Sequence, residues 1–200
     1  MRARLALLAA LGLVLAGCGG SSGVEAVAQT QASKFKGVEL NPPARAPEIA
    51  LRDQNGTLVR LSRLRGKDVF VTFLYVHCPD VCPLIATHLD TALRRIGAKQ
   101  ASGVRILAVS VDPKGDTVAA VRQFVTRHDL LPQFHYLRGT RAELAPIWKA
   151  YHVASWRDPK GTVSHSAFTV LVDPQGKQRV IYDAQFTPAD VVHDLRQLAS

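Results

Sequence analysis

Two cysteines that follow an apolar segment are the residues of this sequence best suited to chemistry. Cys78 and Cys82 are separated by three residues, and each is followed by a proline, Pro79 or Pro83. The apolar run 69–76 before them is typical of a strand, and an amphipathic run follows them. A strand leading into a helix would hold both thiols at the helix N-terminus, where unpaired N–H groups and the helix dipole lower a thiol pKa. Thiolates bind soft metals and exchange with disulfides.

Three chemistries fit such a pair: a structural disulfide, a redox-active dithiol, or a metal site. A disulfide that closes so short a loop would add little stability through chain entropy, so the structural role is the weakest explanation. A redox dithiol is a better one. A metal site fits best, but it requires a third ligand from elsewhere in the chain.

The rest of the sequence predicts an α/β domain around this strand and helix. Segments 48–53 and 57–61 predict a hairpin, because Asn55-Gly56 between them accepts the positive φ angles of a type I′ turn. Apolar patterning predicts further strands at 104–111, 134–137, 166–172 and 177–182, and helices at 82–96, 116–128, 140–151 and 188–198. Pro146 disturbs the third helix unless that helix begins late. This order predicts a thioredoxin-like α/β fold with a mixed central sheet, flanking helices and an N-terminal β-hairpin extension.

His165 is the candidate third ligand. It comes just before the predicted strand 166–172, and in a thioredoxin-like topology the loop before that strand lies against the N-terminus of the cysteine helix. Two thiolates and one imidazole suit Cu(I) and can also hold Cu(II). Five other histidines are interpreted as surface or hydrogen-bonded residues: His88, His128, His135, His152 and His193.

The first residues predict export and a lipid anchor. Residues 1–17 combine a basic start with an apolar stretch too short to span a bilayer, as in a signal peptide. They lead into Leu15-Ala16-Gly17-Cys18, which resembles a bacterial lipobox, so Cys18 is predicted to be diacylated and to become the mature N-terminus. Two acyl chains give stable attachment. The alternative is an ordinary secreted protein with a spare cysteine. Outside the cytosol, the paired cysteines can persist as a disulfide unless they are reduced or bind a metal.

Composition divides the chain into three predicted parts. The signal peptide at 1–17 is followed by the lipidated N-terminus and a flexible tether at 18–46, rich in Gly, Ser, Ala, Gln and Pro, and by a folded domain at 47–200. The chain has 25 Lys and Arg against 16 Asp and Glu, a formal net charge of +9, but its basic residues are scattered. Nucleic acid is therefore not expected as a partner of an exported chain, whereas anionic lipid or an acidic protein face is compatible with the charge.

Three sequence blocks together resemble the Sco/SenC family. They are YVHCPDVCP at 75–83, VSVDP at 109–113 with Asp116-Thr117, and His165-Ser166 followed by LVDP at 171–174. The resemblance implies a membrane-anchored, thioredoxin-like, copper-binding protein with Cys78, Cys82 and His165 as ligands. His77 accompanies the motif without being expected to bind.

The function implied by the resemblance is that of a copper metallochaperone. Such a protein would be anchored on the extracytoplasmic (periplasmic) side of a bacterial membrane and would assist assembly of the dinuclear copper centre of cytochrome c oxidase. Its partners would be the copper-bearing oxidase subunit or another cuproprotein, and other copper chaperones. Asp80 would shape the cysteine loop, and Asp112 would lie near the metal. Ser164 departs from the family pattern, because an aspartate that could orient the imidazole commonly precedes the histidine.

Two enzyme classes are the alternatives. An extracytoplasmic thiol-disulfide oxidoreductase would use Cys78 or Cys82 to attack a disulfide of the same centre or of another cuproprotein, and the other cysteine to resolve the intermediate. Its dithiol usually has two intervening residues, and related reductases place a cis-proline where this chain has Ala167. A peroxidase would carry a Thr-x-x-Cys block, which neither cysteine has. The sequence therefore favours metal transfer.

Overall fold

A six-stranded mixed sheet forms the centre of the computed structural model, which describes residues 33–157 and 163–199. The strand order is β1 (Val38–Glu39), β10 (Gln178–Tyr182), β9 (Thr169–Val172), β4 (Asp68–Leu74), β5 (Val104–Ser110) and β6 (Phe134–Leu137). Strands β4, β5 and β6 are parallel, whereas β9 is antiparallel to both β4 and β10. This order places β4, the strand that leads into the cysteine loop, in the interior of the sheet.

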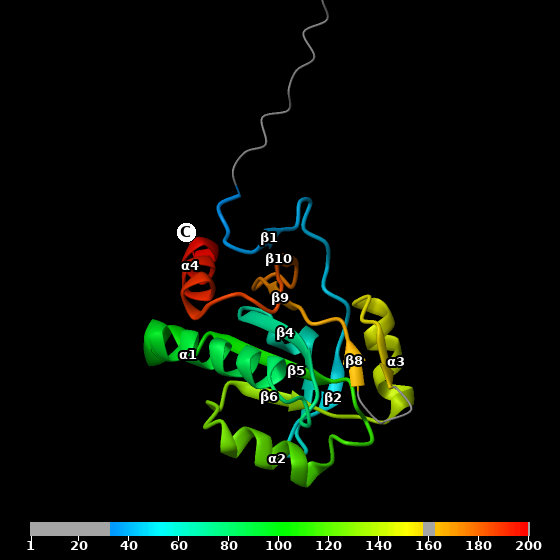
Figure 1. Ribbon diagram of the computed structural model, residues 1–200. Helices are drawn as coiled ribbons and strands as arrows, with labels where there is room; N and C mark the ends of the chain where they lie inside the picture. The colour runs from blue at the N-terminus through cyan, green and yellow to red at the C-terminus, as the bar shows by residue number, and fades with distance from the viewer. Residues whose placement is uncertain (1–32, 158–162, 200) are drawn as a thin grey trace, which may run out of the picture. The chain divides into compact units, whose positions relative to one another are not determined.

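Helices and a hairpin cover the two faces of the sheet (Figure 1). One face carries α1 (Val81–Ala101), α2 (Val118–Arg127) and α4 (Pro188–Ala199), and the other carries α3 (Arg141–Ala150) with the hairpin of β2 (Ala50–Arg52) and β3 (Leu58–Arg60). A short 3-10 helix, η1 (Leu61–Leu64), follows β3. On the first face, Phe124 of α2 packs edge-on against Tyr136 of β6. On the second, Phe73 of β4 packs against Tyr151 at the end of α3.

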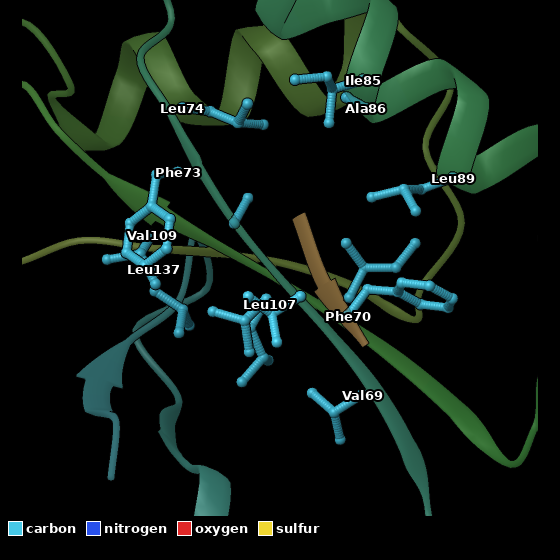
Figure 2. Packing of buried hydrophobic residues seen from close by; sticks show 14 of the residues in the cluster. Val69, Phe70, Phe73, Leu74, Ile85, Ala86, Leu89, Leu107, Val109 and Leu137 are labelled. Atoms are coloured by element: carbon cyan, nitrogen blue, oxygen red, sulfur yellow. The ribbon is translucent and has the colours of Figure 1, made fainter. Parts of the chain in front are cut away.

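Alternating side chains of β4 enter the core on both faces of the sheet. Figure 2 shows Leu74 beside Ile85 of α1, while Phe73 lies with Val109 and Leu137 on the opposite side. All of these side chains are buried. Because both faces are covered, β4 and β5 are continuous apolar runs and not alternating ones. The predicted thioredoxin-like α/β fold with a mixed sheet is confirmed.

The predicted N-terminal hairpin is confirmed, but its turn is of another type. Gly56 has φ +83°, whereas Asn55 is not among the residues with positive φ. The N–H of Gly56 donates to Asp53 O over 3.0 Å, and the N–H of Asp53 donates to Thr57 O over 2.9 Å. The predicted type I′ turn is therefore wrong, since it needs two successive positive φ angles. The Asp53 carboxylate accepts from the N–H groups of Asn55 and Thr57, which stabilises the longer loop.

The predicted strand 166–172 is shorter in the structure. Its second half is β9, whereas residues just before it belong to a separate two-stranded sheet of β7 (Ser155–Arg157) and β8 (Val163–His165). Neither strand of this small sheet is among the strands predicted from sequence. His165 therefore ends a short strand of its own instead of preceding a long one.

Helix α2 and helix α3 each correct one detail of the prediction. Helix α2 begins at Val118, two residues after its predicted start, and Val118 is 43% exposed there, whereas Phe124 is buried. Helix α3 continues through Pro146 and is stabilised at its start by a capping box between Thr140 and Glu143. The proline therefore lies inside the helix.

The folded domain begins before Pro47, the predicted boundary. Phe35 is buried, β1 pairs with β10, and the Asp194 carboxylate accepts hydrogen bonds from the backbone of Lys36 and Gly37. Residues 33–46, assigned to the tether from their composition, are thus packed against the sheet and α4. The signal peptide, Cys18 and the rest of the predicted tether lie outside the described residues. Within the described ranges, none of the helices has the length and apolar character needed to cross a bilayer.

Candidate metal centre

The predicted ligands lie where β4 ends, α1 begins and β8 ends. The nitrogen Nε2 of His165 is 3.9 Å from Cys82 Sγ. The backbone N–H of Cys82 donates to Cys78 Sγ over 3.2 Å. Cys82 therefore contacts both of the other residues, although 83 positions separate it from His165 in the sequence.

The cysteines lie at a helix N-terminus, as predicted. Helix α1 begins at Val81, and Asp80 is its N-cap, with a carboxylate that accepts from the Val81 N–H over 2.6 Å. The N–H of Cys82 belongs to the first turn, so it has no partner within the helix and is available to the Cys78 sulfur. Asp80 is exposed and caps the helix, so it shapes the cysteine loop as expected.

The two thiols have opposite pKa shifts. A hydrogen bond from the Cys82 thiol, together with backbone N–H groups of Cys82 and Asp80, lowers the pKa of Cys78 to about 6. The same hydrogen bond, with burial, raises the pKa of Cys82. The expected activation therefore applies to Cys78 alone, and the pair titrates as a unit. Both cysteines are free, so the described state is the reduced one.

Backbone hydrogen bonding orients the His165 ring. Its Nδ1 is 2.9 Å from the carbonyl oxygen of Ser166, and because a carbonyl only accepts, Nδ1 carries the proton. The lone pair is then on Nε2, the nitrogen nearest Cys82. Burial lowers the pKa of His165, which favours the neutral form that binds metals. Tyr75 packs edge-on against the ring at a centroid distance of 5.8 Å.

A backbone carbonyl thus orients the imidazole, which is the role suggested for an aspartate at position 164. A carboxylate or carbonyl that accepts from the second ring nitrogen fixes the tautomer of a ligand histidine. Ser164 precedes His165 within β8, and successive side chains of a strand point to opposite sides. The departure at Ser164 therefore leaves the imidazole oriented.

The donor atoms of the predicted ligands lie near one another, but they are not arranged to hold a metal ion as they stand. A metal bonded to sulfur at about 2.3 Å and to nitrogen at about 2.0 Å, as in zinc sites, can bridge donors up to about 4.3 Å apart. The distance of 3.9 Å between Cys82 Sγ and His165 Nε2 satisfies this limit. In the ranges 33–157 and 163–199, however, no three His, Cys, Asp or Glu residues are grouped closely enough to hold an ion as they stand. Soft thiolates with an imidazole remain a donor set suited to copper.

Asp116 is a residue of the site that sequence reasoning missed. Its buried carboxylate accepts from the Val76 N–H at 2.9 Å, from Ser110 Oγ at 2.5 Å and from the Tyr136 hydroxyl at 3.1 Å. Burial raises the pKa of Asp116 to about 6. Asp116 begins the predicted helix 116–128, but in the structure Thr117 is the N-cap of α2 and Asp116 lies before it. Asp116 instead fixes the backbone two residues before Cys78.

The loop that contains Asp112 packs against the cysteine loop through a glycine. A Cβ atom placed on Gly115 would lie 2.2 Å from Asp112 Oδ2 and 3.1 Å from His77 Cδ2. Only glycine permits this close approach. Asp112 is buried beside a neighbour of Cys78, and a role for it near a bound metal stays a prediction.

Several other histidines have ordinary structural partners, as predicted. His88 lies 2.8 Å from the carbonyl oxygen of Phe186, His135 pairs with Asp53, and His193 pairs with Asp194.

Comparison with known proteins identifies the family of this chain. The family model described as SCO1/SenC matches residues 39–200. The chain belongs to the SCO1/SenC family. This confirms the resemblance found in the three sequence blocks. Among curated members of the family, it is 26% identical over 155 residues to an SCO2-like protein of Rickettsia conorii, with 74% of each chain covered. It is 31% identical over 135 residues to the mitochondrial SCO2 homologue of Bos taurus, covering 64% of this chain and 50% of that one.

Solved structures of the SCO1/SenC family share the fold. The structure of Bradyrhizobium japonicum ScoI with copper bound matches with a TM-score of 0.69 and 32% identity, over 78% of this chain and 99% of that one. The apo Sco1 protein of Thermus thermophilus matches with a TM-score of 0.72 and 29% identity, over 82% of this chain and 96% of that one.

Proposed function

We propose that this SCO1/SenC protein binds copper through Cys78, Cys82 and His165 and assists assembly of the dinuclear copper centre of cytochrome c oxidase. The observation that carries the proposal is the 3.9 Å approach of His165 Nε2 to Cys82 Sγ. It brings together two residues with no local sequence relation. The bound copper of the Bradyrhizobium japonicum relative supports the choice of metal.

Copper is the cargo of this site, and its three proposed ligands differ in their protonation before copper binds. Cys78 is largely deprotonated at neutral pH, because its pKa is lowered to about 6. His165 is neutral and presents Nε2. Cys82 keeps its proton, so binding through its sulfur must release that proton. Soft sulfur ligands favour Cu(I) over harder competing ions.

The proposal includes the cellular setting implied by the N-terminal sequence. Cys18 would carry the lipid anchor, and the domain would act on the extracytoplasmic side of a bacterial membrane. The recipient would be the copper-bearing oxidase subunit or another cuproprotein, and other copper chaperones would supply the metal.

A second candidate function is thiol-disulfide exchange with the recipient. The favouring observation is that Cys78 is partly exposed with a lowered pKa, whereas Cys82 is buried with a raised one. The Cys78 thiolate would attack a partner disulfide and release one partner thiolate. Cys82 would then lose its proton and attack the Cys78 sulfur, which releases the second thiolate and leaves a Cys78–Cys82 disulfide. One reduced protein would thus reduce one partner disulfide.

Copper titration of the purified protein tests the ligand set. His165→Ala should weaken Cu(I) binding at least about tenfold, because it removes an imidazole ligand. His77→Ala is the matched control, since His77 is exposed and lies next to Cys78 without being an expected ligand. Unchanged affinity and unchanged Cu(II) absorption in His165→Ala would reject the three-ligand site.

Cellular and exchange assays separate the two candidates. Deletion of the gene should lower oxidase activity, and added copper should restore it if metal delivery is the main role. Fast reduction of a recipient disulfide by the metal-free protein, with no rescue by copper, would instead favour the exchange reaction.

A further inference from the structure

A basic groove lies between α1 and α4. It has a volume of about 350 Å³ and is lined by Arg95, Ala189, Val192, His193, Arg196 and Gln197. No carboxylate is among these lining residues. Arg95 and Arg196 are exposed, and within the described residues neither forms an ion pair. The groove therefore presents two guanidinium groups that have no charge partner in the described structure.

The start of the described chain adds one more cation beside this groove. Lys34 Nζ lies 3.4 Å from the carbonyl oxygen of Gln197, a lining residue. The Lys34 side chain is exposed. Lys36 does not belong to this surface, because it lines a separate hollow with Asp183 and Asp190. We define Lys34, Arg95 and Arg196 as the basic patch.

We propose that the basic patch docks the domain onto anionic lipid headgroups of the membrane that carries the protein. The proposal rests on the anchoring of Cys18 that is part of the proposed function. From Cys18 to Ser33 the chain has 33 − 18 = 15 residue steps, which span at most about 50 Å in any conformation. The patch surrounds the point where that chain joins the domain, so the anchor keeps it near the bilayer.

Charge chemistry identifies the partner as a phosphate-bearing surface. Guanidinium groups pair with phosphate oxygens in a bidentate way, and lysines contribute point charges. Each basic side chain near an anionic bilayer raises partitioning about fivefold. A single groove-bound phosphate would use the arginines alone, whereas a bilayer engages all three cations of the patch.

Docking through this patch would leave the cysteine loop accessible. Cys82 lies in the first turn of α1, and Arg95 follows it by 95 − 82 = 13 residues, which is about 20 Å along the helix axis. Figure 1 shows α1 extending away from β8, which carries His165, toward the side of α4. The membrane face and the copper face would then be at opposite ends of one helix.

Sedimentation with lipid vesicles tests the docking without the anchor. The protein used begins at Gly19, and it retains every described element because these form one compact unit from Ser33 onward. It should bind phosphatidylcholine vesicles that contain roughly one-third phosphatidylglycerol, and should not bind pure phosphatidylcholine. Salt at about 0.5 M should release it, because the Debye length falls to a few Å.

A pair of double variants shows whether the patch is the binding surface. Arg95→Glu with Arg196→Glu should lower the vesicle partition coefficient at least about 25-fold, from two lost contributions of about fivefold. Arg63→Glu with Arg141→Glu makes the same change in net charge on η1 and α3, and should lower it less than about threefold. Equal losses in both variants, or no binding of the unaltered protein to anionic vesicles, would overturn the proposal.

Copper stoichiometry measured on the same samples keeps the two proposals apart. The patch is remote from the ligands, so both double variants should bind copper normally. Vesicle binding without copper binding would reject the proposed function alone. Copper binding without vesicle binding would reject the docking alone.

Discussion

Removal of the Cys82 side chain should raise the pKa of Cys78. In the intact protein that pKa is about 6, and the first cause is the hydrogen bond from the Cys82 thiol. A free cysteine has a pKa of about 8.5, so at pH 7 Cys78 should be about 90% thiolate where a free cysteine is about 3%. The structure therefore predicts a roughly thirtyfold enrichment of the reactive form.

The size of the pKa shift of Cys78 depends on which hydrogen-bond donors remain near its sulfur. Cys82→Ala keeps the backbone N–H of residue 82, which lies 3.2 Å from Cys78 Sγ, so the pKa should move only part of the way back. We expect a rise of about one unit or more. Cys82→Ser is the matched control, because its hydroxyl can still donate, and it should give a smaller rise.

A lowered pKa of Cys78 also makes this thiol stabilise the fold above pH 8.5, an effect that is lost as the pH falls through about 6.

Alkylation against pH measures this pKa directly. The reduced, metal-free protein without Cys18 is treated with iodoacetamide between about pH 4 and pH 9, and mass spectrometry locates the adduct on Cys78. The pKa is read from the pH midpoint of the alkylation rate and not from its plateau. A thiolate of low pKa is intrinsically less nucleophilic, so its plateau rate is lower. A midpoint near 8.5 in the intact protein, or the same midpoint in Cys82→Ala, would refute the reasoning.

Three further changes test the packing around the site and the far end of β4. Gly115→Ala should destabilise the fold by about 1–3 kcal/mol in urea denaturation and weaken copper binding, because its Cβ would lie 2.2 Å from Asp112 Oδ2. Gly103→Ala, whose nearest neighbour would be at 3.3 Å, should do less, and equal effects would count against the packing argument. Asp116→Ala should cost about 3 kcal/mol and speed amide exchange at Val76, since three donors lose their acceptor. Slow exchange at Val76 in that variant would show that Asp116 does not hold the loop. Burial, and then the charge of Asp173, raise the pKa of Asp68 to about 6, so its ionisation weakens the fold as the pH rises from about 4 to about 6. Asp68→Asn should therefore stabilise the protein by up to about 1 kcal/mol at pH 7.5 and by less at pH 4.5, and the same gain at both values would contradict this.

Local patterns were sufficient to predict the core of the fold and the two thiols. The apolar run before Cys78 and the stripe after Cys82 have periods that are visible over 8 to 15 residues, so β4 and α1 follow from sequence. The predicted end of the helix at Ile96 also corresponds to a real interruption, because Gly97 has φ +80° inside α1. These features depend on neighbours in the chain.

Features that depend on distant partners could not be predicted in the same way. Strand β8 has only three residues, too few to show a period, and it exists through pairing with β7. Asp116 looks like an ordinary cap residue until the strands place Val76, Ser110 and Tyr136 around it. Phe35 and Val38 are too isolated to suggest a strand, yet Phe35 is buried and Val38 pairs with Ile181 of β10.

The geometry of His165 separates the two candidate functions more sharply than the cysteines do. Copper binding and disulfide exchange both begin with the Cys78 thiolate, so any variant of Cys78 abolishes both. His165 contacts Cys82, the residue that acts second in exchange and that must lose its proton to bind copper. Loss of the imidazole should therefore leave the first attack of Cys78 on a disulfide intact while it removes a proposed copper ligand. A His165→Ala protein that still forms a mixed disulfide through Cys78 but no longer holds copper would assign the imidazole to the metal.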